Sequence, residues 1–228
     1  MEKKFILTDK FVINSFGIKL FQIKCTKSFK YAQKGDFGGY VEKEGNLDQE
    51  NDAWVSGNAR VFGNAWVFGD AWVFGDALVS GNARVFGNAR VFGNAWVSGD
   101  ALVFGDALVS GDARVFGNAR VSGDAWVFGD ALVSGDARVF GNAWVSGDAD
   151  IENDNEHCGF DGFGSCNRHT HAYMTKEKKV EIICGCFRGS IEEFEKKVEE
   201  THSGTVYEKQ YKSIINVIKI KFGLTDFT

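Results

Sequence analysis

The sequence predicts a mainly β protein built on a parallel β-helix of about six coils, with a small N-terminal β cap and a C-terminal α+β domain. Two observations carry this prediction. A six-residue phrase, G-[ND]-A-x-V-[FS], repeats through the middle of the 228-residue chain, and the composition changes where the repeat begins and ends. The predicted parts are therefore the cap at 1–44, the β-helix at 45–152 and the C-terminal domain at 153–228.

The repeat predicts triangular coils made of three short strands each. Eighteen hexapeptides run from Gly45 to Glu152, the first and last degenerate. Because side chains alternate along a strand, the Ala and Val of each phrase point together into the coil. Gly followed by Asn or Asp suits the corners, since these residues accept positive φ. The apolar positions never lose phase, which argues against a disordered low-complexity tract.

The phrase resembles the [LIV]-x-x-x-[STAV]-x motif of hexapeptide-repeat proteins, and this resemblance implies a left-handed parallel β-helix. Three hexapeptides close one coil, so residues eighteen apart are predicted to stack in columns. Read in this way, four of the six Trp fall on one outward face, and four Phe form a column on another. The third face is the most polar.

Stacked aromatic side chains stabilise a coil by ladder packing. An apolar surface of this size is rarely left to water, so we also expect the Trp-rich face to be covered by another subunit or by the terminal segments. The sequence thus predicts self-association as a dimer or trimer. The predicted interface comprises Trp54, Trp72, Phe74, Phe92, Trp126, Phe128 and Trp144.

The segment before the repeat reads as three strands, within residues 4–13, 18–29 and 34–47. An open parallel coil exposes strand edges and needs a cap, which this segment is predicted to form. It carries nine Lys and five acidic residues, whereas residues 45–152 carry six Arg and fourteen acidic residues. The two parts therefore differ in net charge, +4 against −8.

The chain shows no signal for export or membrane insertion. Its basic start is followed by an apolar run that Thr8, Asp9 and Lys10 interrupt, so no signal-peptide core forms. No segment approaches the ~20 apolar residues that span a bilayer. Five Cys, four of them between residues 158 and 186, do not fit a secreted disulfide framework. We therefore expect a soluble intracellular protein with no membrane partner.

The segment after the repeat reads as a loop, two strands and two helices. The loop is NEHCGFDGFGSCNRH at 155–169, and the strands lie at 170–175 and 180–187. Ser190 and Glu193 form a capping box that opens the first helix. The second helix is predicted from about Val206 to Phe222. Its buried stripe is expected to be Tyr211, Ile214, Ile215 and Ile218.

The flanks carry a more specific resemblance than the repeat. The stretches KGDFGGYVEKEGNLDQENDAWV and ICGCFRGSIEEFEKKVEETHSG, together with the repeat, resemble a family of uncharacterised hexapeptide-repeat proteins common in phages and prophages. The resemblance implies a phage accessory protein in the bacterial host cytoplasm and transfers no settled activity. Members tend to show a G-S-x-N-R-x-T element before the CGCF strand. It corresponds here to Gly164, Ser165, Asn167, Arg168 and Thr170.

The glycine-rich loop is the main candidate for ligand binding. Its spacing permits a nest of backbone N–H groups that faces an anion, and Arg168 supplies a planar fork suited to phosphate. Cys184 and Cys186 are expected to alternate with Ile182 along one strand and to face one side. The predicted ligand-binding residues are Gly164, Ser165, Asn167, Arg168, Thr170, Cys184, Cys186 and Arg188.

A zinc site is a weaker interpretation of the same region. His157, Cys158, Cys166, His169, His171, Cys184 and Cys186 include enough ligands for zinc, but no C-x-x-C pair is present and buried Cys often act as small apolar residues. A reactive thiol is the other alternative. The sequence therefore predicts no metal and no cofactor.

The predicted function is that of a non-catalytic binding protein with a counter-defence or host-takeover role, which binds a host protein or sequesters a small nucleotide. A purely structural oligomeric scaffold is the alternative. An acyltransferase is a lesser one, because no His precedes His157 and no loop interrupts the coils. A DNA mimic is another lesser alternative, since Arg, Trp and Phe side chains interrupt the acidic residues on the faces. Direct nucleic-acid binding is not expected.

Overall fold

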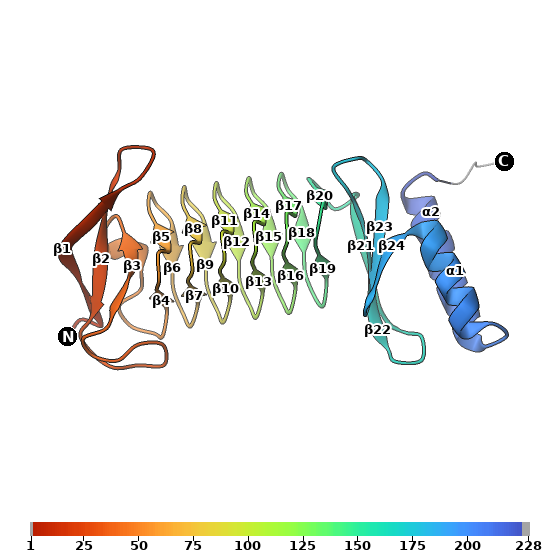
Figure 1. Cartoon of the computed structure of the whole chain (residues 1–228), viewed down its shortest axis with the longest axis horizontal. Helices are drawn as coiled ribbons and strands as arrows, with labels where there is room; N and C mark the ends of the chain where they lie inside the picture. The colour runs from red at the N-terminus through yellow and green to blue at the C-terminus, as the bar shows by residue number, and fades with distance from the viewer. Residues whose placement is uncertain (1, 225–228) are drawn as a thin grey trace.

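The computed structural model describes residues 2–224. The molecule is an elongated rod in which an N-terminal cap, a stack of coils, a four-stranded sheet and two helices follow one another along the axis (Figure 1). The predicted fold class is confirmed: the chain forms a mainly β parallel solenoid of about six turns, with a small antiparallel sheet and two C-terminal helices.

The solenoid consists of two-residue strands that stack on three faces, each pairing in parallel with the strand eighteen residues away. Trp54, for example, pairs with Trp72. The Trp-rich face contains β4 (Trp54–Val55), β7 (Trp72–Val73), β10 (Arg90–Val91), β13 (Leu108–Val109), β16 (Trp126–Val127) and β19 (Trp144–Val145).

The Phe column lies on the second face. Phe68, Phe86 and Phe104 stack with centroid distances of 4.7 and 5.0 Å and nearly parallel rings, so the predicted ladder packing is present. The strands of this face are β6 (Trp66–Val67), β9 (Arg84–Val85), β12 (Leu102–Val103), β15 (Arg120–Val121) and β18 (Arg138–Val139).

The third face continues into the cap. Its strands are β5 (Arg60–Val61), β8 (Leu78–Val79), β11 (Trp96–Val97), β14 (Arg114–Val115), β17 (Leu132–Val133) and β20 (Asp150–Ile151). Inside the coils, the Ala and Val of every phrase from Ala53 to Val145 are at most 3% exposed. Burial of these small side chains is the main force that holds the solenoid together.

The corners explain why the phrase starts with Gly. Gly111 has φ +68°, and a Cβ added there would lie 2.9 Å from the backbone N of Gly129 in the next coil. The following Asn or Asp extends the stacking, because its backbone N–H donates to the Gly carbonyl one coil on, as from Asn94 to Gly111. Asn side chains add a second ladder, for example from Asn94 Nδ2 to Asp112 Oδ1 at 3.0 Å.

The cap is a β-meander that joins the solenoid through its last strand. It contains β1 (Phe5–Ile13), β2 (Lys19–Cys25), β3 (Phe37–Val41) and the short 3-10 helix η1 (Glu44–Asn46). Strand β3 pairs in parallel with β5, so the meander extends the third face. Lys4 Nζ donates to the carbonyls of Asn51 and Ala53 at the open end of the first coil.

The cap also covers the start of the Trp-rich face. Trp54 is 2% exposed and lies against the rings of Phe5 and Phe29. Trp72 stacks on Tyr31 with a centroid distance of 5.0 Å. A terminal segment therefore covers these two residues, and Trp54 is out of reach of a second subunit. The other five residues of the predicted interface lie farther along the rod.

The C-terminal sheet has two more strands than predicted. Its strands are β21 (His157–Phe163), β22 (Arg168–Met174), β23 (Val180–Cys184) and β24 (Phe187–Ser190), all antiparallel. The expectation of a loop over 155–169 is wrong, because β21 pairs with β22 through most of that segment. The expectation of one strand over 180–187 is also wrong, because Gly185, at φ +59°, and Cys186 form a turn.

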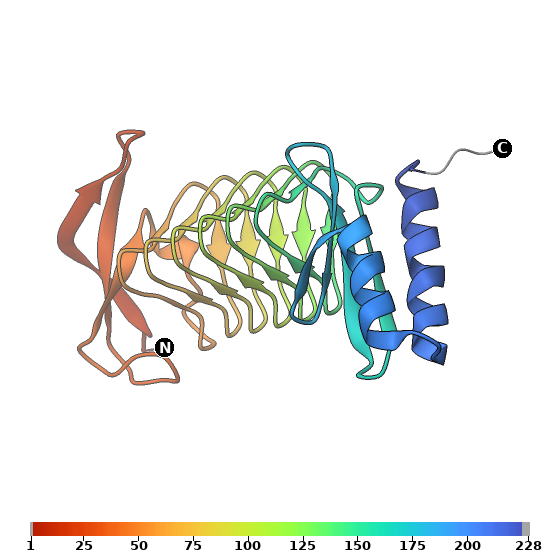
Figure 2. The same cartoon turned by 45° about the vertical axis from the view of Figure 1, so that its right-hand side comes forward.

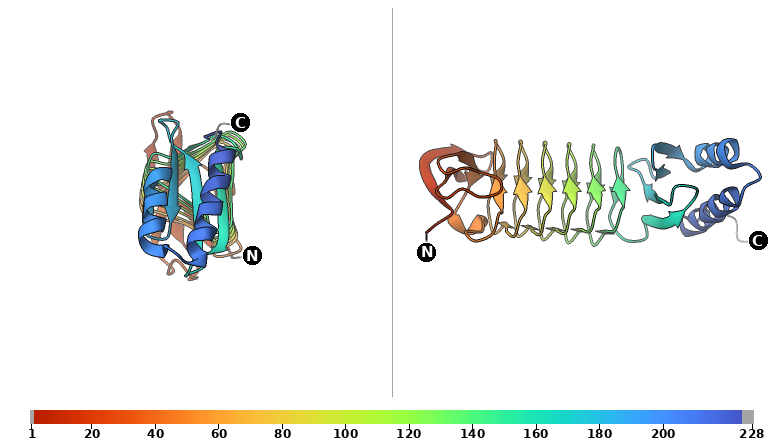
Figure 3. Two further views of the ribbon diagram at one scale, coloured as in Figure 1. Left: turned by 90° about the vertical axis from the view of Figure 1, so that its right-hand side faces the viewer. Right: turned by 90° about the horizontal axis from the view of Figure 1, so that it is seen from below.

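The two helices cover one face of this sheet, and the last coil covers the other (Figure 2; Figure 3, right). They are α1 (Ile191–His202) and α2 (Val206–Lys221). The predicted capping box at Ser190 and Glu193 is present, and the four residues of the predicted stripe are buried. Within residues 2–224, no helix is long and apolar enough to cross a membrane.

Candidate functional site

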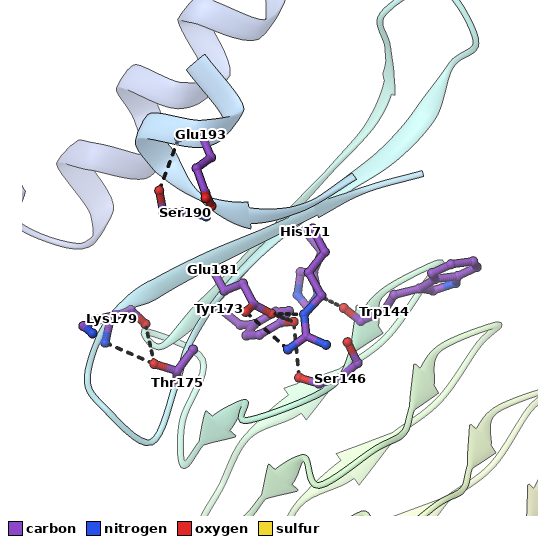
Figure 4. A network of polar contacts seen from close by, with 10 residues as sticks. Trp144, Ser146, His171, Tyr173, Thr175, Lys179, Glu181, Ser190 and Glu193 are labelled. Carbon is purple, nitrogen blue, oxygen red and sulfur yellow. Dashed lines mark hydrogen bonds and ion pairs between the residues drawn. The ribbon is translucent and has the colours of Figure 1, made fainter. Parts of the chain in front are cut away.

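The C-terminal sheet is fixed to the last coil by a network of polar contacts (Figure 4). Arg188 forms a two-point ion pair with Glu181, with distances of 2.6 and 3.3 Å, and Glu181 accepts a hydrogen bond from the Tyr173 hydroxyl. The Arg188 guanidinium covers Gly147 so closely that a Cβ there would overlap it. Arg188, predicted to bind a ligand, is instead engaged in this junction.

Two buried histidines lie beside this network. His171 Nδ1 is 3.0 Å from the Trp144 carbonyl oxygen, which can only accept, so Nδ1 carries the hydrogen. The neutral Nε2 of His171 then accepts from His157 Nδ1 at 3.1 Å. Burial lowers the pKa of His157 and lowers that of His171 to about 3. The pair is therefore neutral at neutral pH.

An Asp–His pair occupies the neighbouring edge of the sheet. His169 Nδ1 lies 2.7 Å from Asp161 Oδ1, and this hydrogen bond holds the pKa of Asp161 below its usual value. Asn142 Nδ2 contacts the same carboxylate oxygen at 3.4 Å. Because the ionised Asp161 only accepts, His169 donates to it through Nδ1, and its other ring nitrogen is Nε2. That atom is buried and has no hydrogen-bond partner among residues 2–224.

These groups border a cleft of about 360 Å³ between the last coil and the C-terminal sheet. Trp144 lines it and is 41% exposed. Arg168 lines it from the sheet, with its side chain across Gly185. In the described part of the chain, the Arg168 guanidinium has no ion-pair or hydrogen-bond partner. The polar and aromatic lining of the cleft comprises Asn142, Trp144, Asp161, Asn167, Arg168 and His169.

The structure does not bring the predicted ligand-binding residues together in one site. Asn167 and Arg168 line the cleft. Thr170 and Cys184 face the helices instead, where Thr170 Oγ1 contacts Cys184 Sγ at 3.3 Å. Cys186 lies in the turn after β23 and is exposed, so it does not share a face with Cys184 as expected.

The first N–H group of the predicted anion nest does not face the cleft. Gly164 and Ser165 belong to the turn between β21 and β22. The backbone N–H of Gly164 donates to Gln210 Oε1 at 2.9 Å, and a Cβ at Gly164 would overlap the Tyr211 hydroxyl. This turn therefore rests on α2, because its glycine allows close contact there, and its N–H is not available to an anion.

Sequence reasoning missed Asn142, Trp144 and Asp161 as cleft residues. Asp161 lay in a segment interpreted as a loop, so its pairing with His169 on a neighbouring strand was hidden. Asn142 lies at a corner position of the repeat, and Trp144 was assigned to the predicted oligomer interface. No three His, Cys, Asp or Glu side chains within residues 2–224 form a group that could hold a metal ion.

The solenoid is the part of the chain that resembles known proteins. A family model described as YdcK Beta solenoid repeat matches residues 53–69, 83–99, 113–129 and 131–147. A search of curated proteins finds no match. The matched segments all lie in the coils, and nothing in the match indicates a phage origin, so the phage context stays a prediction. The repeat region of this chain is thus similar to the YdcK beta-solenoid repeat, and this similarity concerns the fold.

Proposed function

We propose that the protein binds a small anionic molecule in the cleft between the last coil and the C-terminal sheet. The observation that carries the proposal is the position of Arg168, whose guanidinium lines a cleft and lacks a partner within residues 2–224. A guanidinium offers two parallel donors that match a phosphate or a carboxylate. An unpaired cation at a concave site is therefore a ready contact for an anionic ligand.

The other cleft groups support a ligand with several polar atoms. Asn142 and Asn167 offer amide donors and acceptors to such a ligand. The Asp161 carboxylate lies in the same cleft, where its Oδ1 contacts His169 and Asn142. A cleft of 360 Å³ also falls within the usual range of small-molecule sites, about 300–1,000 Å³.

The biological role that we propose is sequestration. The resemblance of the flanks to phage and prophage proteins favours an accessory protein that removes a small host molecule by binding it. In this role the solenoid is a rigid support that presents the cleft at one end of the rod.

A structural scaffold is the second candidate. Several large apolar side chains on the coils are exposed in the single chain: Trp66 at 40%, Phe116 at 36% and Phe140 at 64%. Such exposure favours contact with another copy. Light scattering distinguishes the candidates, because a monomeric wild type would remove the self-association that the scaffold needs.

Calorimetric titration tests the binding proposal. The probes are inorganic phosphate, pyrophosphate and the nucleoside monophosphates. We expect at least one to bind, and Arg168→Gln to weaken it about tenfold or more, as for the loss of a charge-assisted hydrogen bond. Arg84→Gln is the matched control, since Arg84 is an exposed arginine three coils before the last one. Failure of every probe to bind, or equal binding by Arg168→Gln, would contradict the proposal.

A further inference from the structure

The tryptophans of the solenoid follow a rule that links positions sixteen residues apart. Trp72, Trp96 and Trp126 each have a Ser sixteen residues earlier, on the preceding coil. In each case the indole Nε1–H donates to that hydroxyl, at 2.9, 3.3 and 3.1 Å. The hydrogen bond draws the indole down onto the face, where all three residues are half-buried.

Two other tryptophans are held in different ways. Trp66 has Glu50 at the earlier position and stacks instead on Phe68, with a centroid distance of 4.0 Å and an angle of 25°. Trp54 is buried beneath the cap. Each of these five indoles is therefore secured by a Ser, a Phe or the cap.

Trp144 lacks all three kinds of support. Sixteen residues before Trp144 the chain has Phe128 in place of a Ser. Two residues after Trp144 it has Ser146, whereas Trp66 has Phe68 at that position. The rings of Trp126 and Phe128 meet Trp144 at 80° and 84°, so neither stacks on it. The indole is 41% exposed and lines the cleft.

The backbone of Trp144 is nevertheless fixed. Its carbonyl oxygen accepts the hydrogen bond from His171, and the indole extends away from the polar network of the junction (Figure 4). An exposed aromatic ring on a rigid backbone is well suited to stacking, because little conformational freedom is lost when a ligand binds.

We propose that Trp144 is a stacking platform and that the ligand is a planar heteroaromatic anion of the nucleotide type. Its ring would lie on the indole and its anionic group on Arg168, the two contacts that line one cleft. This inference rests on the proposed function and adds the class of ligand. Stacking of a base on an aromatic side chain contributes enough to change affinity about 5- to 100-fold on alanine substitution.

The test compares ligands that differ only in the ring. Wild-type protein is titrated calorimetrically with each nucleoside monophosphate and with ribose 5-phosphate, which keeps the sugar and phosphate. We expect at least one nucleotide to bind about fivefold or more tightly than ribose 5-phosphate. Trp144→Ala is expected to remove this preference and Trp144→Phe to restore part of it. Trp66→Ala is the matched control, because Trp66 is 40% exposed on another face.

A second variant changes the orientation of the indole and keeps the ring. Phe128→Ser installs the missing hydroxyl sixteen residues before Trp144, so the rule predicts a hydrogen bond that draws the indole down. Nucleotide affinity should then fall about fivefold or more, and ribose 5-phosphate affinity should not change. Circular dichroism of each variant verifies that the coils remain folded.

The outcomes separate the two proposals. If ribose 5-phosphate and the nucleotides bind equally well and Trp144→Ala has no effect, stacking is refuted while anion binding at Arg168 stands. If neither these compounds nor inorganic phosphate or pyrophosphate binds, the proposed function fails and this inference fails with it.

Discussion

Acid should weaken the junction between the last coil and the C-terminal sheet, because His171 is buried there without a charge. His171 is 1% exposed, and burial lowers its pKa from 6.5 to about 3. Below pH 6.5 the unfolded chain therefore binds a proton that the folded chain does not, and the free energy of unfolding falls as the pH falls. In this range, each pH unit changes the free energy of unfolding by about 1.4 kcal/mol.

The expected loss follows directly. Between pH 7.5 and pH 5, His171 alone should lower the free energy of unfolding by about 2 kcal/mol. His157, whose pKa is also lowered, acts in the same direction. The charged groups around the pair are Asp154, which favours protonation of His157, and Lys221, which opposes it. A charge on His169 opposes protonation of His171. The decline should continue towards pH 3.

The assay is urea unfolding followed by circular dichroism at pH 7.5, 6 and 5. His171→Asn keeps a donor for the Trp144 carbonyl and removes the titration, so its stability should change less with pH than that of the wild type. His202→Asn, on α1, is the control and should keep the full dependence. The reasoning is refuted if the wild type loses no stability down to pH 5, or if His171→Asn loses as much as the wild type.

Three further predictions concern the solenoid, and urea unfolding measures each of them. Asn94→Asp should lower the free energy of unfolding by about 1 kcal/mol, because it removes the donor to Asp112 and places a third carboxylate between Asp76 and Asp112. Asp112→Asn is the control and should not destabilise the protein. An equal loss in both variants would contradict the proposed Asn ladder. Gly111→Ala should cost about 1–2 kcal/mol or more, since its backbone has φ +68° and its Cβ would approach Gly129; Gly45→Ala, in open space, should be nearly neutral. Ser110→Ala should lower the free energy of unfolding by about 1 kcal/mol, because it leaves Trp126 Nε1 without its acceptor. Ser98→Ala is the control and should cost less, because the residue sixteen positions after Ser98 is Arg114 and not a Trp. Equal losses would count against the Ser–Trp rule.

The coils could be predicted in detail because their contacts are set by a fixed period. Once Ala and Val point inward, residues eighteen positions apart must stack on successive coils. Trp54 and Trp72 are therefore expected to be neighbours. The strands of the cap could also be predicted, since β1, β2 and β3 lie within the predicted ranges. Its contact with Trp54 could not, because nothing in the repeat indicates which face the segment covers.

The candidate site was harder to predict because its residues meet across unrelated elements. Gly159 suggested a loop, yet it lies in a strand where a Cβ would overlap His169. The glycine is required by a contact with the neighbouring strand and not by a turn. Asn142 and Asp161 likewise come together only when the sheet closes the last coil. Arg168 was identified from its motif, whereas the platform at Trp144 needed the geometry of the other five tryptophans.

Nuclear magnetic resonance of the indole N–H groups tests the central claim most directly. The chain has six Trp, and Trp144→Phe assigns the signal of the cleft residue. The nucleotide that binds most tightly is added stepwise to ¹⁵N-labelled protein. A shift of the Trp144 signal that saturates, with the Trp66 and Trp96 signals unmoved, is the predicted result. An unmoved Trp144 signal under conditions where calorimetry detects binding would contradict a ligand site in this cleft.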